Sequence, residues 1–350
     1  MKKRFAAITL AAALTLGLTA CGGSSSAPAS SKAPGASAPV ESAAPQTGAS
    51  EVKAAILLPG TINDAGLSAA GYNGLMEAKD EFGLADAAYS ESVPLAEQES
   101  TIRDYANRGY NLIIGHGNDF LDAIKTVAPD YPDTAFAVTN AVVTDMDNVV
   151  GIDIKNEEQG YVAGYALGLL TESNKVGFVG SMELLAQTRV QNGFEQGLKA
   201  ANTDAEALVS YVGSMSDSAK AKDQAVALFE QGADCVFQYA QGAGISVVQA
   251  AEENGKTIVV TSPSQQEMAP NTAAMFVQTD TKQQIIAAVQ AYVDGEFSSD
   301  LKIEGTFASG LFKTGGFNDK LMSSEIQQQV QKVIDDLTSG ALMLEVTVAS

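Results

Sequence analysis

Short apolar runs alternate with longer amphipathic stretches from about residue 51 onward. Apolar runs bounded by Gly, Pro, Asn or Asp are typical of buried strands, and apolar residues that recur every three or four positions are typical of helices. A helical pattern lies between successive runs. The predicted strands are 52–58, 111–115, 135–138, 149–154, 176–179, 208–212, 235–238 and 257–260.

Strands that are apolar along their whole length and alternate with helices predict parallel sheets covered on both faces. The chain has two such series, so we expect an α/β protein with two doubly wound parallel-sheet lobes. In these sheets, ligands bind beyond the carboxyl ends of the strands. The residues most informative about function are therefore those that directly follow each strand.

The N-terminus has the pattern of an export signal. Basic residues at 2–4 precede an apolar run at 5–18, which is long enough for the core of a signal peptide but short for a membrane span. The run ends in Leu-Thr-Ala-Cys21, which resembles the bacterial lipobox. We therefore expect a signal peptide at 1–20, a lipid on Cys21, and a flexible Ser-, Ala-, Pro- and Gly-rich tether within 21–50.

Charge and composition exclude several functions. The chain has 21 Lys and Arg against 42 Asp and Glu, a net charge of −21, which argues against nucleic-acid binding. One histidine, His116, and one cysteine beyond the signal, Cys235, cannot build the usual zinc sites. The chain has no P-loop, complete dinucleotide fingerprint or nucleophile elbow, so we expect neither an enzyme nor a cofactor. We expect His116 to be a loop residue near the binding site and Cys235 to be a buried, inert thiol.

Polar side chains follow most of the predicted strands. Amides, hydroxyls and carboxylates of this kind hydrogen-bond a neutral polar solute. Turn and cap chemistry also favours Asn, Asp, Ser and Gly at such places, so no single residue decides the matter. Because all of these loops are polar, a binding site between the two lobes is the better interpretation. The loops are 59–68, 116–120, 139–140, 180–183, 238–244 and 261–266.

Several segments together match a known family. They are 63–68, 71–74, 158–164, 175–182, 189–197, 231–244 and 315–316. With these segments, the region from about 52 to 317 resembles the BMP-type (basic membrane protein) lipoproteins, which are solute receptors of ABC importers, many of them for purine nucleosides. The resemblance implies a monomer at the outer face of the cell membrane that passes a small polar solute to an ABC transporter permease.

The resemblance also implies a type I periplasmic-binding fold, with two lobes joined by a hinge of crossing strands. We expect the N-terminal lobe at 51–155 plus about 262–300, and the C-terminal lobe at 156–261 plus about 301–350. The crossings are then expected near 153–158, 261–265 and 300–305.

Ligand-binding residues follow from the loops and from the resemblance. The resemblance assigns Asn63, Asp64 and Ser68 to the first lobe's share of the site. It assigns Gln241, Gly242 and the loop after Val260 to the second. The full set of candidates is Asn63, Asp64, Leu67, Ser68, Tyr72, Asn118, Asn140, Met182, Tyr239, Gln241, Gly242, Ser262, Ser264 and Lys282.

Two departures from the family leave the ligand open. Leu67 stands where the family often has an aromatic residue that stacks on a base, so Tyr72, Phe120 or Tyr239 would have to stack instead, unless they belong to the core. Nucleoside receptors carry an aspartate for the ribose hydroxyls, whereas this chain has Ser262 and Ser264 in that loop. A carboxylate accepts from two hydroxyls at once, which two serines do less strongly.

The leading hypothesis is a receptor for a nucleoside or purine-like solute. The alternatives are a receptor for a sugar or a signalling solute on the same fold, a sensory receptor for a membrane kinase, and an enzyme built on carboxylates alone. The export signal and the lack of a helix-turn-helix motif argue against a transcription factor.

Overall fold

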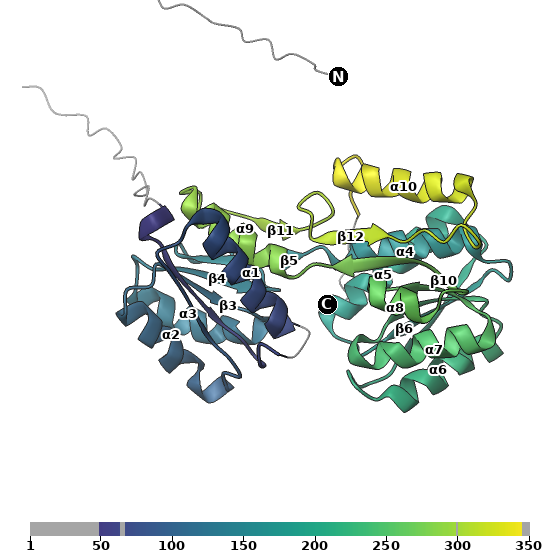
Figure 1. Ribbon diagram of the computed structural model, residues 1–350, viewed down its shortest axis with the longest axis horizontal. Coiled ribbons are helices and arrows are strands. Elements are labelled where there is room, and N and C mark those ends of the chain that lie inside the picture. Colours follow the sequence, from purple (N-terminus) through teal and green to yellow (C-terminus); the bar gives the residue numbers. More distant parts are fainter. Residues whose placement is uncertain (1–48, 64–66, 299, 345–350) are drawn as a thin grey trace, which may run out of the picture. The chain divides into compact units, whose positions relative to one another are not determined.

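The computed structural model describes residues 49–63, 67–298 and 300–344 (Figure 1). Every element described below belongs to one compact unit of the chain. The predicted signal peptide, the lipidation site Cys21 and nearly all of the tether lie outside the described residues, as does Asp64.

The first sheet has six parallel strands in the order β11-β5-β4-β3-β1-β2. Its central strands are short and fully buried, as their unbroken apolar sequences predict. The strands are β1 (Lys53–Leu57), β2 (Asp86–Ser90), β3 (Leu112–Gly115), β4 (Ala135–Thr139), β5 (Val149–Ile154) and β11 (Ile303–Gly305).

Helices cover both faces of this sheet, and the sheet with these helices is called the first lobe below. Alternate residues of β1 point to opposite faces. Ile56 packs in one cluster with residues of α1 (Leu67–Phe82) and α9 (Lys282–Val293). Leu57 packs in another with residues of α2 (Gln98–Asn107) and α3 (Leu121–Val127).

The second sheet has the order β12-β10-β9-β8-β6-β7, with only β12 antiparallel. One face is covered by α4, α5 and α10 and the other by α6 and α7, forming the second lobe (Figure 1). The strands are β6 (Lys175–Gly180), β7 (Glu206–Tyr211), β8 (Cys235–Tyr239), β9 (Thr257–Val260), β10 (Ala273–Thr279) and β12 (Phe312–Gly315). The helices are α4 (Asn156–Leu170), α5 (Leu185–Ala201), α6 (Ser218–Glu230), α7 (Gly244–Asn254), α8 (Pro263–Met268) and α10 (Ser324–Thr338).

Single 3₁₀ turns complete the connections. They are η1 (Ala49–Glu51), η2 (Leu95–Glu97), η3 (Asn118–Phe120), η4 (Ala128–Asp130) and η5 (Gln241–Ala243). Two of them, η3 and η5, directly follow central strands of the two sheets, so their backbones lie where ligands of such sheets bind.

Glycines let α4 and α5 lie backbone to backbone. A Cβ added at Gly160 would stand 1.9 Å from the carbonyl oxygen of Val190, and one at Gly193 would stand 1.9 Å from that of Glu157. Gly164 and Gly197 repeat this contact one turn further along, at 2.0 and 2.1 Å. Because residues four apart lie on one helix face, the two glycine pairs form the surface along which the helices touch.

The chain crosses between the sheets at places that differ in part from the prediction. The first passage lies between β5 and α4, within the expected 153–158. The return near 261–265 is wrong, because β10 still belongs to the second sheet. The assignment of 301 onward to the C-terminal lobe is also wrong at its start, because β11 pairs with β5 of the first sheet.

Both errors have local causes. The strand β10 begins with two alanines, which favour strands weakly, and its last two residues are only half-buried. The strand β11 has three residues with the exposed Glu304 in the middle, as suits an edge strand, and so carries almost no apolar signal.

Candidate functional site

Three segments of the first lobe meet at one edge of its sheet. Leu57 of β1 lies opposite Gly115 of β3, which lies opposite Val138 of β4, so the carboxyl ends of these strands are level. The predicted residues that follow these strands are Asn63, Asn118 and Asn140, and all three are exposed. Asn118 and Asn140 follow β3 and β4 closely, whereas Asn63 lies further along the connection after β1. Each of these amide side chains can donate and accept hydrogen bonds.

A buried histidine ties this edge to α1. His116, directly after β3, has no exposed surface. Its Nε2 donates to the carbonyl oxygen of Leu67 at 2.9 Å, and its Nδ1 lies 3.1 Å from Oγ1 of Thr139. Since a carbonyl oxygen can only accept, the proton is on Nε2. Leu67, the first residue of α1, is thus tied to this edge of the sheet through its backbone carbonyl.

Two other first-lobe candidates have structural contacts. Ser68 is buried, and its hydroxyl accepts a hydrogen bond from the backbone N–H of Gly60 at 2.9 Å. This bond links the first turn of α1 to the residues that follow β1. The ring of half-buried Tyr72 packs edge-on against Tyr89 with centroids 4.9 Å apart. These contacts shape the loop and the core beside the edge.

Lys282 forms an ion pair with Glu77 across α9 and α1. Its Nζ lies 2.7 Å from Oε2 of Glu77, and this hydrogen bond raises the pKa of Lys282. The two side chains are 32% and 46% exposed, so water screens the pair. The charge of Lys282 is thus directed at the neighbouring helix.

The second lobe presents a matching edge. Gly180 of β6 lies opposite both Tyr211 of β7 and Tyr239 of β8, which makes these carboxyl ends level. Met182 follows β6 and is half-buried, whereas Gln241 and Gly242 follow β8 and are exposed.

Tyr239 belongs to the core more than to the edge. Its ring lies 5.9 Å from that of Phe237, within the cluster under α4 and α5. Burial raises the pKa of Tyr239 to about 12, so its hydroxyl is neutral in the physiological range.

The loop after β9 is ordered by its own hydrogen bonds. Ser262 caps α8, since its hydroxyl accepts from the backbone N–H of Gln265 at 3.3 Å, and it lies 3.0 Å from the hydroxyl of Ser264. The buried side chain of Gln238 donates to Oε1 of Gln265 at 2.6 Å and to Oγ1 of Thr261 at 3.0 Å. Sequence reasoning missed this role of Gln238 and Gln265, although an amide at the end of an apolar strand was a usable signal.

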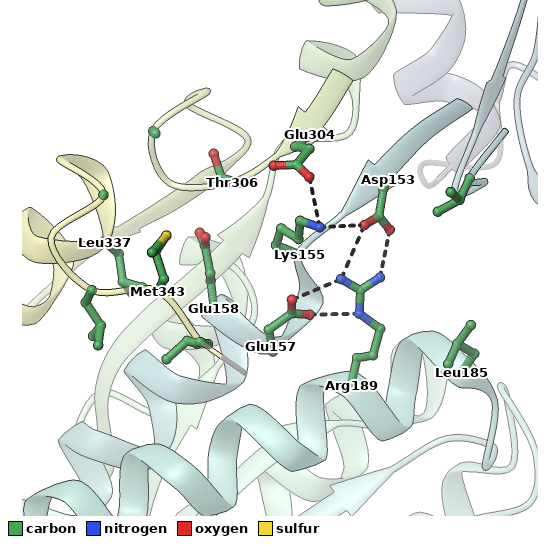
Figure 2. Close-up of a pocket in the computed structure, with 15 residues that line it drawn as sticks. Asp153, Lys155, Glu157, Glu158, Leu185, Arg189, Glu304, Thr306, Leu337 and Met343 are labelled. Carbon is green, nitrogen blue, oxygen red and sulfur yellow. Dashed lines mark hydrogen bonds and ion pairs between the residues drawn. The ribbon is translucent and has the colours of Figure 1, made fainter. Parts of the chain in front are cut away.

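Figure 2 shows a charged network at the crossing segments, which the sequence did not predict. Arg189 of α5 holds Glu157 with Nε at 2.8 Å and Nη2 at 3.0 Å, and holds Asp153 with Nη1 at 2.7 Å. Lys155 lies 3.0 Å from both Asp153 and Glu304. The network therefore joins strands β5 and β11 of the first sheet to helices α4 and α5 of the second lobe.

The network is mostly out of water. The side chains of Arg189 and Glu157 are 13% and 4% exposed. Burial alone would raise the pKa of Asp153, but hydrogen bonds from Arg189 and Lys155 outweigh it and hold that pKa below its ordinary value. Carboxylates buried like these depend on their cations for stability.

A cavity of about 680 Å³ lies beside this network (Figure 2). One part of its lining is charged and another is apolar, including Leu337 and Met343. None of the predicted ligand-binding residues lines it. Glu158 does, and its Oε2 accepts from the backbone N–H of Phe307 at 2.8 Å. Burial raises the pKa of Glu158 to about 7.

The raised pKa of Glu158 predicts how the stability of the protein depends on pH. The pKa of Glu158 in the folded protein lies above the ordinary value of 4.5, so ionising this carboxyl destabilises the folded state. The loss of stability is complete above about pH 7 and disappears as the pH falls toward 4.5. Glu158→Gln keeps an acceptor for Phe307 and cannot ionise. We expect this variant to be about 1–2 kcal/mol more stable than the wild type at pH 8 and equal to it near pH 5, measured by urea unfolding. An equal difference at both pH values, or the same profile in the exposed control Glu267→Gln, would contradict the account.

Cys235 is the free cysteine among the described residues and is buried in β8. The expected burial is confirmed, and it raises the pKa of the thiol well above the ordinary value, which disfavours the reactive thiolate. Within the described part of the chain, no helix is long and apolar enough to cross a membrane. In the same residues, no group of three or more His, Cys, Asp or Glu side chains is arranged to hold a metal ion.

Comparisons with known proteins give relatives that match most of this chain. The family model of PnrA-like ABC transporter substrate-binding proteins, named Bmp, matches residues 51–336. The ABC transporter nucleoside-binding protein BmpA of Lactococcus lactis subsp. cremoris (strain MG1363) is 28% identical over 316 residues, which cover 84% of this chain and 89% of that protein. The transcriptional activator protein med of Bacillus subtilis (strain 168) is 28% identical over 288 residues, covering 81% and 87%.

A solved structure shows the same fold. It is the solute-binding protein of an ABC transporter system from Conexibacter woesei DSM 14684, with a TM-score of 0.67 and 24% identity over 84% of this chain and 98% of that one. Together with the two helix-covered sheets, this likeness confirms the predicted periplasmic-binding fold.

Proposed function

We propose that this chain, which belongs to the Bmp family of PnrA-like ABC transporter substrate-binding proteins, binds a nucleoside or purine-like solute and delivers it to the permease of an ABC importer. The family is one of solute-binding proteins and not of enzymes, so a receptor role is the starting point. Support for the nucleoside comes from the Lactococcus lactis relative, which is named as a nucleoside-binding protein. Further support comes from the amides at the two sheet edges.

The observation that carries the proposal is the backbone at two of these amides. Asn140 has φ 59° and directly follows β4, and Gln241 has φ 53° and is the second residue after β8. A left-handed backbone costs an ordinary residue about 1–2 kcal/mol and is uncommon for glutamine. Strain of this kind clusters at functional sites and is the stronger argument for Gln241, since asparagine adopts this backbone more easily. We infer that Asn140 and Gln241 hydrogen-bond the solute from opposite lobes.

The remaining edge residues define the rest of the proposed site. Asn63 and Asn118 would add amide contacts in the first lobe, and Met182 would contact the flat face of a base. Amides suit a purine, whose edge alternates donors and acceptors. Specificity would arise because a wrong solute leaves these groups unpaired.

Glycine variants test the site without disturbing its backbone. Gln241→Gly and Asn140→Gly remove the side chain while keeping a residue that readily adopts positive φ. We expect each to weaken binding of the solute about tenfold, the effect of one lost hydrogen bond, with no loss of stability. Isothermal titration calorimetry measures the first quantity and thermal unfolding the second.

Asn174 provides the matched control. It has φ 60° but precedes β6, at the opposite end of the strand from the proposed site. Asn174→Gly should therefore leave the dissociation constant unchanged. If all three variants bind the solute as the wild type does, the amides do not form the site.

We further propose that the protein is held at the outer face of the membrane by a lipid on Cys21. The lipobox-like sequence before Cys21 and the family's role in ABC import support this placement. A lipid anchor would keep the receptor close to its permease. Cys21→Ser should release the protein from the membrane fraction, and continued membrane association of this variant would refute the anchor.

A further inference from the structure

The first lobe contains a buried side chain that connects three elements at the edge assigned to the ligand. His116 is the single histidine of the chain and is fully buried. Its backbone N–H donates to the carbonyl oxygen of Leu57 at 3.0 Å, so its main chain is fixed at the ends of β1 and β3. Its ring reaches β4 through Thr139 and α1 through Leu67.

The ring fits only because the next turn of α1 has a glycine facing it. A Cβ at Gly71 would stand 2.5 Å from Cδ2 and 2.9 Å from Nε2 of His116. Close contact on that side, with a hydrogen bond on each nitrogen, leaves the imidazole a single orientation. The orientation directs Nε2 at the first residue of α1.

This bond acts on the connection that carries Asn63. The connection between β1 and α1 is tied at its base by the Gly60–Ser68 bond, and α1 is tied at its first residue by the Leu67–His116 bond. Asn63 lies between these points and is exposed. Because Ser68 of α1 holds Gly60, three residues before Asn63, moving the first turn of α1 would also move the segment that carries Asn63.

We propose that His116 is a positioning residue for ligand binding, which fixes the first turn of α1 against the ends of β3 and β4 and so sets the placement of Asn63 beside the other amides. It acts through the backbone of Leu67 and does not touch the solute. This inference rests on the proposed function for its binding readout.

Two amide substitutions at His116 each keep one of the two hydrogen bonds that the imidazole ring makes. In His116→Gln, the amide nitrogen falls near the former Nε2 and can still donate to Leu67. In His116→Asn, the shorter amide reaches the position of Nδ1 and keeps Thr139 while losing Leu67. Both variants lose one bond of a buried side chain, so we expect similar falls in melting temperature.

The proposal predicts different binding by the two variants. His116→Asn should raise the dissociation constant for the solute bound by the wild type at least tenfold, whereas His116→Gln should stay within about threefold of it. If the two variants bind equally well, or if His116→Asn binds as the wild type does, His116 has only a structural role and the proposal is wrong.

A second readout does not need the solute. Hydrogen–deuterium exchange of the full chain without ligand should show faster exchange in the first turn of α1 in His116→Asn but not in His116→Gln. This result supports the positioning role even if no nucleoside binds, which keeps the two proposals separate. Equal exchange in the two variants would overturn the positioning role.

Discussion

Replacing Gly193 with alanine is expected to destabilise the protein by about 4 kcal/mol or to prevent its folding. The new Cβ would stand 1.9 Å from the carbonyl oxygen and 2.6 Å from the carbonyl carbon of Glu157. Both atoms belong to the backbone of α4, so no side-chain rotation can relieve the clash. The helices would have to separate, which would open the core that they share with the second sheet.

Gly242→Ala is the matched control for this substitution. The one atom within 4 Å of its added Cβ is the carbonyl oxygen of Met215, at 3.1 Å, and the residue is exposed. We expect a change of less than about 1 kcal/mol. Urea unfolding of both variants measures the difference, and similar midpoints would contradict the close packing of α4 on α5.

Replacing Arg189 with alanine is expected to cost about 3–5 kcal/mol at neutral pH. The substitution leaves Glu157, whose side chain is 4% exposed, and Asp153 without the guanidinium that holds them (Figure 2). A buried carboxylate without its cation pays the full loss of hydration. Arg103→Ala removes an ion pair that is 36% and 59% exposed, and it should cost no more than about 1 kcal/mol.

The stability difference between wild type and Arg189→Ala should also depend on pH in a definite direction. The folded pKa of Asp153 is below its ordinary value, so the stability from its pairing is present above that ordinary value and is lost as the pH falls through the folded pKa. The gap between wild type and Arg189→Ala should therefore be largest at pH 7 and shrink below about pH 4. A constant gap from pH 7 to pH 3, or equal losses in the Arg103 and Arg189 variants, would show that the network adds no specific stability.

The parts of the fold that could be predicted are those in which burial dictates residue type. The run at 112–115 is buried on both faces of a parallel sheet, so it is apolar throughout and predicts its own strand. Edge strands have no such constraint. In β11 the exposed Glu304 carries out an electrostatic role with Lys155, and three residues are too few to show a period.

For the candidate site, the sequence predicts which segments lie together but not where their side chains point. Parallel strands bring their carboxyl ends to one edge, so the sequence alone predicts that the segments carrying Asn118 and Asn140 lie close together. The assignment of Asn63 to the site comes from the family resemblance. The direction of each side chain depends on local hydrogen bonds that no pattern encodes. Ser262 faces its own helix as a cap for this reason.

The charged network at the crossing segments illustrates a second limit. Asp153, Glu157 and Arg189 come together because α4 and α5 pack closely, which is a tertiary event with no spacing rule. The alternation of charged residues at 153, 155 and 157, where a strand gives way to a helix, was the available signal. It becomes informative only when the partner helix is known.

The central claim is that the two amide-bearing edges bind a nucleoside or purine-like solute. The most direct test is a calorimetric titration of the purified protein with adenosine, guanosine, inosine, adenine, hypoxanthine, ribose, glucose and galactose. The account predicts saturable binding of at least one nucleoside or base, with a dissociation constant of about 1 μM or below, and weaker binding by Gln241→Gly. Binding of a sugar alone, or of none of these solutes, would contradict it.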